Sequence, residues 1–227
     1  ASIAAQGKLT PELETAIIAA TKLHELEDIY LPFRPKKRTR AQLAREKGLE
    51  PLAMLILAQQ LSEGSPLTIA QDFATPANGL TAAAALEGAQ DIIAEIVSGR
   101  PDIRGLIRRR LWQAAELATE LAVSEAEGQE FLTYKEYREP VRCMPPHRIL
   151  AVNRGERRKM IKVRLLAIHA ANVELIERNV IKQPSIFTDI IRNAIADGYK
   201  RLLLPSLERE LRSELTETAE RQAIKVF

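Results

Sequence analysis

Proline recurs at the start of apolar segments, and this feature most constrains what the chain can fold into. Pro11 follows the hydroxyl residue Thr10, Pro51 and Pro101 open two further apolar segments, and Pro205 opens the last one. Because proline has a fixed φ and no backbone N–H, it is favoured at the first position of a helix and unfavourable inside helices and sheets. We therefore expect a series of helices joined by short connections.

The spacing of apolar residues supports the same interpretation. Steps of three and four residues connect Leu13 to Tyr30 and Ile103 to Leu121, which is the period of an amphipathic helix. The aromatic content is only 4%, and the helix formers Ala, Leu, Arg and Glu are abundant. With Thr39 and Thr81 as N-caps, helices are expected over residues 11–30, 40–48, 51–64, 82–99, 101–123, 147–155, 185–203 and 205–227.

The pattern changes after Gly128. Residues 131–148, "FLTYKEYREPVRCMPPHR", contain three of the twelve prolines and are expected to be largely irregular, and Gly155 is expected to end the next helix by adopting a positive φ. Residues 160–168, "MIKVRLLAI", alternate as a strand does. Its partner is left open between residues 140–144, in a hairpin, and a domain outside this chain. The fold class is all-α, with room for one small β-hairpin near 140–168.

Two regions are expected on this basis. Residues 1–130 form a helical region with a basic turn at 34–47, and residues 131–227 form a second helical region with a short strand near 160–168. The apolar content of 46% and the charged content of 28% are ordinary for a globular protein. No apolar run approaches the length of a membrane span, and no export signal is present, so we expect a cytoplasmic protein.

Motifs for catalysis and cofactor binding are missing from the sequence. Cys143 is the only cysteine, which excludes an internal disulfide and fits a reducing compartment. Cys143 and His147 stand four residues apart, but two ligands do not make a zinc site and the pair lacks a nucleophile signature. Neither a Walker loop nor a dinucleotide fingerprint occurs. We expect no enzyme activity, no cofactor and no metal.

Basic residues gather in three clusters that hold 18 of the 33 Lys and Arg residues. The first occupies 34–47, and the second consists of Arg104 and Arg108 to Arg110. The third cluster contains Arg148, Arg154, Arg157, Arg158, Lys159, Lys162 and Arg164. Such clusters suit contact with phosphates of a nucleic acid, but each also suits the solvated face of a helix, as when Arg108 and Arg109 point to solvent. Charge alone does not decide between nucleic-acid contact and a solvated face.

Four segments resemble the bacterial transcription accessory protein family Tex. "LEDIYLPFRPKKRTRAQLAREKGLEPLA" resembles a signature near the front of that family, and "EPVRCMPPHRILAVNRGERRKMIKV" resembles a second block with Pro-Pro-His-Arg and Arg-Gly-Glu. "ALEGAQDIIAEIVS" and "DGYKRLLLPSLERELRSELTETAERQAIKVF" are similar to two further segments. The similar segments follow the family's order over nearly the whole chain.

The resemblance implies a cytoplasmic, nucleic-acid-binding protein of transcription, related to a eukaryotic elongation factor that works with RNA polymerase. It implies a helical region with a helix-turn-helix-like element, followed in the family by an RNase H-like (YqgF) domain, helix-hairpin-helix motifs and an OB-fold RNA-binding module. This chain matches the helical region that precedes the YqgF domain.

We therefore expect a helical scaffold that binds RNA or DNA without sequence preference. The expected contact residues are Arg34, Lys36, Lys37, Arg38, Arg40, Arg148, Arg154, Arg157 and Arg158. Competing structural roles remain, such as pairing of Arg34 with Glu27 or Asp28. The alternative function is a protein-interaction scaffold that docks RNA polymerase or other domains of the same protein without touching nucleic acid.

Overall fold

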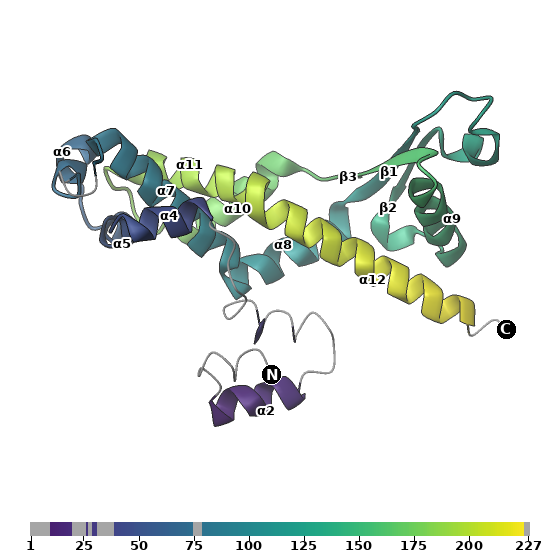
Figure 1. Cartoon of the computed structure of the whole chain (residues 1–227), viewed down its shortest axis with the longest axis horizontal. Helices are drawn as coiled ribbons and strands as arrows, with labels where there is room; N and C mark the ends of the chain where they lie inside the picture. Colours follow the sequence, from purple (N-terminus) through teal and green to yellow (C-terminus); the bar gives the residue numbers. More distant parts are fainter. Residues whose placement is uncertain (1–9, 20–25, 27–28, 31–38, 75–78, 225–227) are drawn as a thin grey trace. The chain divides into compact units, whose positions relative to one another are not determined.

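The computed structural model describes residues 10–19, 26, 29–30, 39–74 and 79–224, in two units that divide between Thr39 and Arg40 (Figure 1). In the first unit, helix α2 (Pro11–Ala19) begins as expected, because the hydroxyl of Thr10 accepts a hydrogen bond of 3.3 Å from the N–H of Leu13. The expected pairing of Arg34 with Glu27 or Asp28 lies outside the described residues.

Most helices of the second unit begin near the expected positions, whereas those over residues 66–71 and 169–180 were not expected. They begin with α4 (Arg40–Glu46), α5 (Glu50–Ala58), α6 (Pro66–Gln71), α7 (Ala82–Gly99) and α8 (Pro101–Ala114). Thr81 caps α7 by accepting a hydrogen bond of 3.2 Å from the N–H of Ala84. After the sheet come α10 (His169–Val180), α11 (Thr188–Gly198), the π-helical turn η4 (Tyr199–Leu203) and α12 (Leu204–Ile224). None of the described helices is long and apolar enough to cross a membrane.

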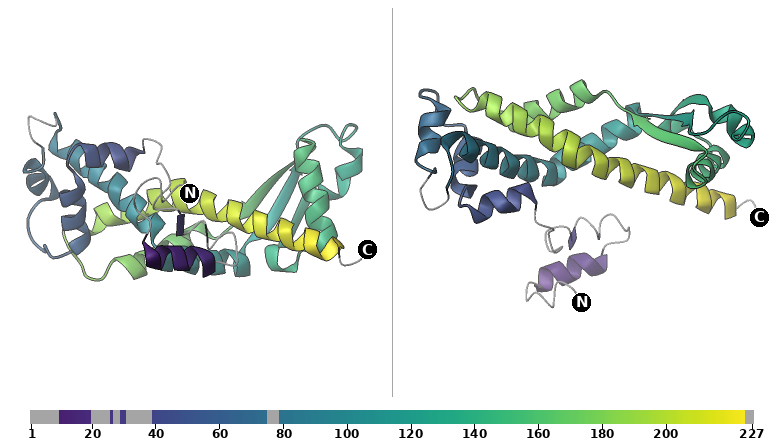
Figure 2. Two further views of the ribbon diagram at one scale, coloured as in Figure 1. Left: turned by 60° about the horizontal axis from the view of Figure 1, so that its bottom comes forward. Right: turned by 45° about the horizontal axis from the view of Figure 1, so that its top comes forward.

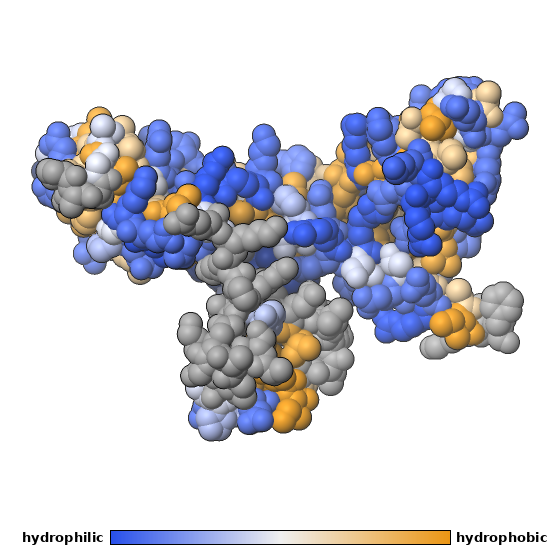
Figure 3. All heavy atoms as spheres, viewed as in Figure 1, coloured by the Kyte–Doolittle hydropathy of each residue, from blue (hydrophilic) through white to orange (hydrophobic). Residues whose placement is uncertain are grey.

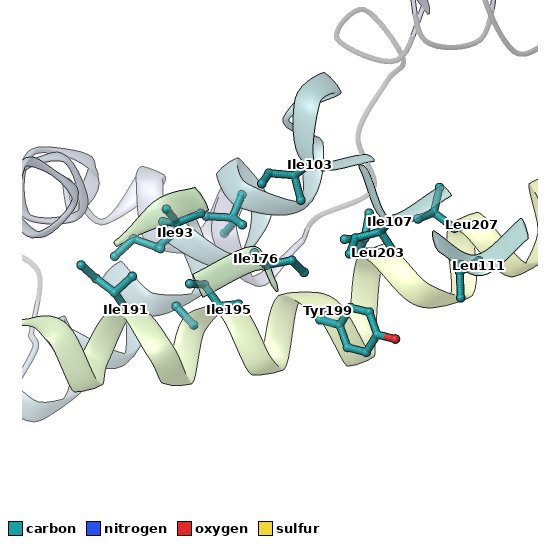
Figure 4. Close-up of a cluster of buried hydrophobic side chains, with 14 of the residues drawn as sticks. Ile93, Ile103, Ile107, Leu111, Ile176, Ile191, Ile195, Tyr199, Leu203 and Leu207 are labelled. Atoms are coloured by element: carbon teal, nitrogen blue, oxygen red, sulfur yellow. The ribbon is translucent and has the colours of Figure 1, made fainter. Parts of the chain in front are cut away.

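Helix α7 is at the centre of the helical core. It packs against α4, α5, α6 and α11, and the inward side chains of Ile93, Ile191 and Ile195 are almost completely buried (Figure 4). Gly198 permits the close approach of α11, since a Cβ there would lie 2.9 Å from the carbonyl oxygen of Ala94. Burial of several whole isoleucine side chains, each contributing about 1.5–3 kcal/mol, is the main stabilising term here.

Helices α11 and α12 continue into one another, although a new helix was expected to open at Pro205. Proline cannot donate to the carbonyl four residues earlier, so it normally breaks a helix. Here η4 widens the preceding turn, and the N–H of Leu204 donates to the carbonyl of Tyr199, five residues back. The wider π-helical turn thus accommodates Pro205, and the helix continues past it.

A three-stranded antiparallel sheet interrupts the helices, in the order β2–β1–β3. The strands are β1 (Glu116–Leu121), β2 (Glu136–Pro140) and β3 (Ile161–Leu166). The strand expected at 160–168 is confirmed as β3, but pairing with 140–144 is wrong, because β3 pairs with β1. The expected helix to Val123 is also wrong, since α8 ends at Ala114 and β1 follows.

Helix α9 (Pro146–Arg157) covers one face of this sheet, together with the short turn η2 (Gln129–Tyr134), while the turn η3 (Val141–Cys143) follows β2. Both views in Figure 2 keep α9 beside the strands and against the C-terminal part of α12, which it contacts. We call β1, β2, β3, η2, η3 and α9 the sheet lobe.

Gly155 does not end α9, contrary to the expectation. It is buried inside the helix, and the positive φ of 60° belongs to Lys159, just after the helix. A Cβ at position 155 would lie 2.8 Å from the ring of Phe131 and 2.9 Å from Cδ1 of Ile161. Gly155 is therefore required by close packing of the helix onto η2 and β3.

Replacement of Gly155 by alanine tests this packing. We expect Gly155→Ala to lower the free energy of unfolding by about 1–3 kcal/mol, because the added methyl group must displace Phe131 and Ile161. Gly105→Ala in α8 is the matched control, since its Cβ meets only the guanidinium of Arg109 at 3.6 Å. Removing a helical glycine there should stabilise by about 0.5–1 kcal/mol. Urea denaturation followed by circular dichroism measures both, and equal effects would contradict the packing role.

Candidate nucleic-acid interface

The first basic cluster lies mostly outside the described residues. This holds for Arg34, Lys36, Lys37 and Arg38, whereas Arg40 is the exposed first residue of α4. Burial raises the pKa of the Asp91 carboxyl on α7, and the guanidinium groups of Arg201 and Arg40 offset part of that increase.

Two of the four residues of the second basic cluster, Arg104 and Arg108, are engaged inside the fold, whereas Arg109 is exposed as expected. Arg104 is buried, with 7% of its surface exposed, and it donates to the carboxylate of Glu210 on α12. Arg108 donates to the other oxygen of Glu210 at 2.8 and 3.0 Å. The interpretation of Arg108 as a solvent-facing residue is therefore wrong, and these two cations join α8 to α12 rather than forming a free basic surface.

Removal of the Glu210 carboxylate tests how much the contact between α8 and α12 depends on this ion pair. We expect Glu210→Ala to lower the free energy of unfolding by about 3 kcal/mol, because it removes the carboxylate that the buried Arg104 shares with Arg108. The exposed Glu217→Ala on the same helix should change it by less than about 0.5 kcal/mol. Urea titration at neutral pH measures the difference. A loss in Glu210→Ala as small as in the control would show that the ion pair contributes no net stability.

The third cluster is divided between two faces of the sheet lobe. Arg148 donates to Glu139 at 3.0 Å and lies 5.7 Å from the ring centre of Tyr137, so β2 holds its side chain. Arg154 and Arg158 share the carboxylate of Glu130, at 3.9 and 2.6 Å.

On the outer side of α9, the exposed Arg157 has no carboxylate partner among the described residues. The basic residues of α9 are thus partly neutralised by carboxylates of the sheet lobe.

The face of the sheet opposite α9 carries the remaining basic residues. Side chains alternate along the strands, so buried Leu117 and Thr119 point to α9 while Ala118 and Glu120 point away. A depression of about 530 Å³ opens on this side. It is lined by Ala118, Thr119, Glu120, Lys135, Glu136, Tyr137, Arg138, Lys162, Arg164 and Leu166. We call this surface the outer sheet face.

The register places two arginines on either side of a small residue. Ala118 pairs with Arg138 on β2 and with Arg164 on β3, so the three form one row across the sheet. Neighbouring strands lie about 4.8 Å apart, which puts the backbones of the two arginines roughly 10 Å from each other. Because the small side chain of Ala118 leaves space between them, both guanidinium groups can approach one anionic ligand.

The charge of the outer sheet face is positive but mixed. Four basic side chains and two carboxylates line it. Glu120 pairs with Arg164 at 2.9 Å and with Lys162 at 3.7 Å, and those two cations remain 65% and 64% exposed. Arg138 is exposed and has no carboxylate partner within the described residues. In Figure 3 hydrophilic residues cover much of the sheet lobe, at the upper right.

The four basic residues of this face are not among the contact residues expected from the sequence. Lys135 and Arg138 lie in the segment expected to be irregular, and Lys162 and Arg164 were recognised as basic but not selected. The available signal was the alternation Lys162–Val163–Arg164, which puts both charges on one face of a strand.

No group of three or more His, Cys, Asp and Glu side chains that could hold a metal ion occurs in the described parts of the chain. Cys143 is exposed. His169 begins α10, with Nδ1 3.2 Å from the hydroxyl of Tyr199, which also accepts a hydrogen bond of 2.9 Å from Asn172. Burial raises the pKa of this tyrosine.

The comparisons with known proteins agree with the sequence segments quoted above. A family profile described as Tex central region-like matches residues 62–227. The chain is 38% identical over 228 residues to uncharacterized protein YdcI of Bacillus subtilis, which covers 99% of this chain and 32% of that protein. It is 37% identical over 242 residues to Protein tex of Bordetella pertussis, covering 100% and 30% respectively.

A eukaryotic relative extends the similarity. S1 RNA-binding domain-containing protein 1 of Pongo abelii is 30% identical over 238 residues, covering 98% of this chain and 24% of that protein. The chain spans about a third of the length of the first two relatives.

Proposed function

Because this chain belongs to the Tex family, in its central region, we propose that it serves as a helical scaffold that contributes sequence-independent nucleic-acid binding to transcription. The observation that carries the proposal is the row of Arg138, Ala118 and Arg164 on the outer sheet face. The name of the eukaryotic relative, S1 RNA-binding domain-containing protein 1, supports RNA as a ligand of the whole protein. The proposed role is binding, without catalysis.

The proposed mechanism uses charge rather than base recognition. Exposed guanidinium and ammonium groups hold phosphates and release condensed counterions, which favours binding at low salt and gives no sequence preference. The outer sheet face lacks an exposed aromatic platform among its lining residues, since Tyr137 points toward Glu139 and Arg148. A phosphate-directed contact fits this lining better than stacking of bases.

The outer sheet face can be tested with a triple variant. Arg138→Ala, Lys162→Ala and Arg164→Ala together should weaken binding of a labelled single-stranded RNA at about 50 mM salt, and should make the log–log salt slope shallower by about 2, since each phosphate contact contributes about 0.7. Fluorescence anisotropy measures both. The charge-matched control removes the exposed Arg178, Arg192 and Arg209, which lie on α10, α11 and α12. Equal effects of the two triples would reject a specific contact surface.

The basic cluster at 34–47, which includes helix α4, remains a second proposed contact. Helices α4 and α5 meet at Gly48, whose φ of +79° reverses the chain. We propose this pair as the helix-turn-helix-like element, with the basic residues before it contacting phosphates. The quadruple variant Lys36→Ala, Lys37→Ala, Arg38→Ala and Arg40→Ala is expected to bind the same RNA more weakly with a shallower salt slope. Unchanged anisotropy would remove this cluster from the proposal.

The alternative is a scaffold that docks RNA polymerase or other domains of the same protein. It predicts no oligonucleotide binding by the unmodified chain even at about 50 mM salt, where electrostatic contacts are strongest. The anisotropy experiment therefore separates the two functions before any variant is made.

A further inference from the structure

The two edges of the sheet differ in their ability to accept another strand. Ala122 N–H donates to Met160 at 2.8 Å, and Val141 N–H donates to Ala115 at 3.0 Å, each to the residue directly opposite. In an antiparallel ladder such directly bonded pairs recur at every second residue. The even-numbered residues of β1 therefore bond to β3, and its odd-numbered residues bond to β2.

The outer edge of β2 is blocked by its sequence. Its odd-numbered residues face β1, so its even-numbered residues turn their backbone groups away from the sheet, and Pro140 is one of them. Proline offers no N–H to an added strand, and it is tolerated at this position because that side of an edge strand needs no donor. Pairing of a further strand along β2 is therefore unfavourable.

The outer edge of β3 is open. By the same alternation, Ile161, Val163 and Leu165 direct their N–H and carbonyl groups away from β1. Within the described residues, no hydrogen bond joins the backbone groups of these three residues to another part of the chain. The segment contains no proline and no bulge, so successive donors and acceptors are available along one line.

A second depression follows this edge. It measures about 470 Å³ and is lined by Ala122, Glu156, Lys159, Ile161, Lys162, Val163 and Arg164. Its carboxylate, on Glu156, is already engaged by the guanidinium of Arg212. The exposed Lys159, Lys162 and Arg164 therefore give this edge a positive charge.

We propose that β3 accepts an extended segment of a partner protein as a fourth strand, and that this segment alternates acidic and apolar residues. Side chains of an added strand fall alternately on the two faces of the sheet. On one face they meet Lys162 and Arg164, which favour carboxylates, and on the other they meet half-buried Val163 and Leu165, which favour apolar groups. The added strand runs antiparallel to β3 and so continues the pattern of the sheet.

A second copy of this chain is a poor occupant. Antiparallel pairing of β3 with another β3 around Val163 would place Lys162 opposite Arg164 twice, and like charges directly opposite one another are destabilising. The same two cations also hinder indiscriminate edge-to-edge association. A partner with carboxylates removes this repulsion, so the charge of the edge selects for acidic strands.

The probe is a synthetic peptide about eight residues long, long enough to span the strand, in which Glu alternates with Val. It should bind the 227-residue chain, measured by isothermal titration calorimetry, and a peptide with Lys in place of Glu should not bind. N-methylation of the Val nitrogens, which face β3 in the antiparallel arrangement, should weaken binding at least about tenfold, through loss of several backbone hydrogen bonds. N-methylation of the Glu nitrogens should leave it nearly unchanged. Equal effects of the two methylations would overturn strand addition.

Substitution of the protein provides a matched test. Val163→Pro removes an outward N–H while leaving the ladder to β1 intact, so it should abolish peptide binding. RNA binding through the outer sheet face should persist in this variant, because Arg138, Lys162 and Arg164 remain. Peptide binding unaffected by Val163→Pro would overturn the inference without touching the proposed function. Unchanged RNA binding in the triple variant above would count against the proposed function and leave this inference unchanged.

Hydrogen exchange tests addition of the peptide to β3 in the unmodified chain, so it applies even if the proline variant does not fold. In the unmodified chain, saturating peptide should slow exchange of the Val163 and Leu165 amides, measured by NMR, and leave the amide of Lys162, already bonded to β1, nearly unchanged. Binding without this protection would mean that the peptide contacts only basic side chains, which would overturn the inference.

Discussion

The central strand β1 is the element on which the rest of the sheet lobe depends, because its backbone bonds to neighbours on both sides. It connects two strands that lie more than twenty residues apart in the sequence, from 136–140 and 161–166. It also provides Leu117 and Thr119 to the face under α9 and Ala118 to the other face. The hydroxyl of Thr119 donates to the carbonyl of Tyr134 at 2.6 Å, which ties η2 to the strand.

The basic residues of this chain serve two different purposes. Arg104 and Arg108 pair with Glu210, and Arg212 pairs with Glu156, so α12 is joined through charge to both α8 and α9. Such half-buried pairs fix the relative placement of helices more than they add stability, since desolvation offsets much of their attraction. The exposed Arg138, Lys162 and Arg164 are the residues that we propose to contact ligands. A count of basic residues in the sequence does not separate these roles.

Most of the helical part of the fold, though not α6 and α10, could be predicted because its signals are local. The cap at Thr81, the turn at Gly48 and the proline at the start of α8 each act within a few residues. Strand β1 could not be predicted in this way. Its sequence "ELATEL" consists mainly of helix formers and continues the spacing of α8, and only pairing with β2 and β3, distant in sequence, makes it extended.

The candidate site was harder to predict for the same reason. Gly155 carried a local signal for a helix end, but its actual role is contact with Phe131 and Ile161, which no local pattern reveals. The row of Arg138, Ala118 and Arg164 exists only once three separate segments are aligned in register. Charge clustering pointed to this part of the chain, while the choice of face required the sheet.

Lys162 and Arg164 line both depressions of the sheet lobe, the one on its outer face and the one along its open edge. Two anionic ligands placed there would compete for one pair of positive charges, even though their binding surfaces lie on different sides of β3. Thermodynamic linkage then requires the antagonism to be mutual, since each ligand lowers the affinity for the other by the same factor. Through β3, an acidic protein segment could therefore displace a polyanion although the two ligands differ in shape.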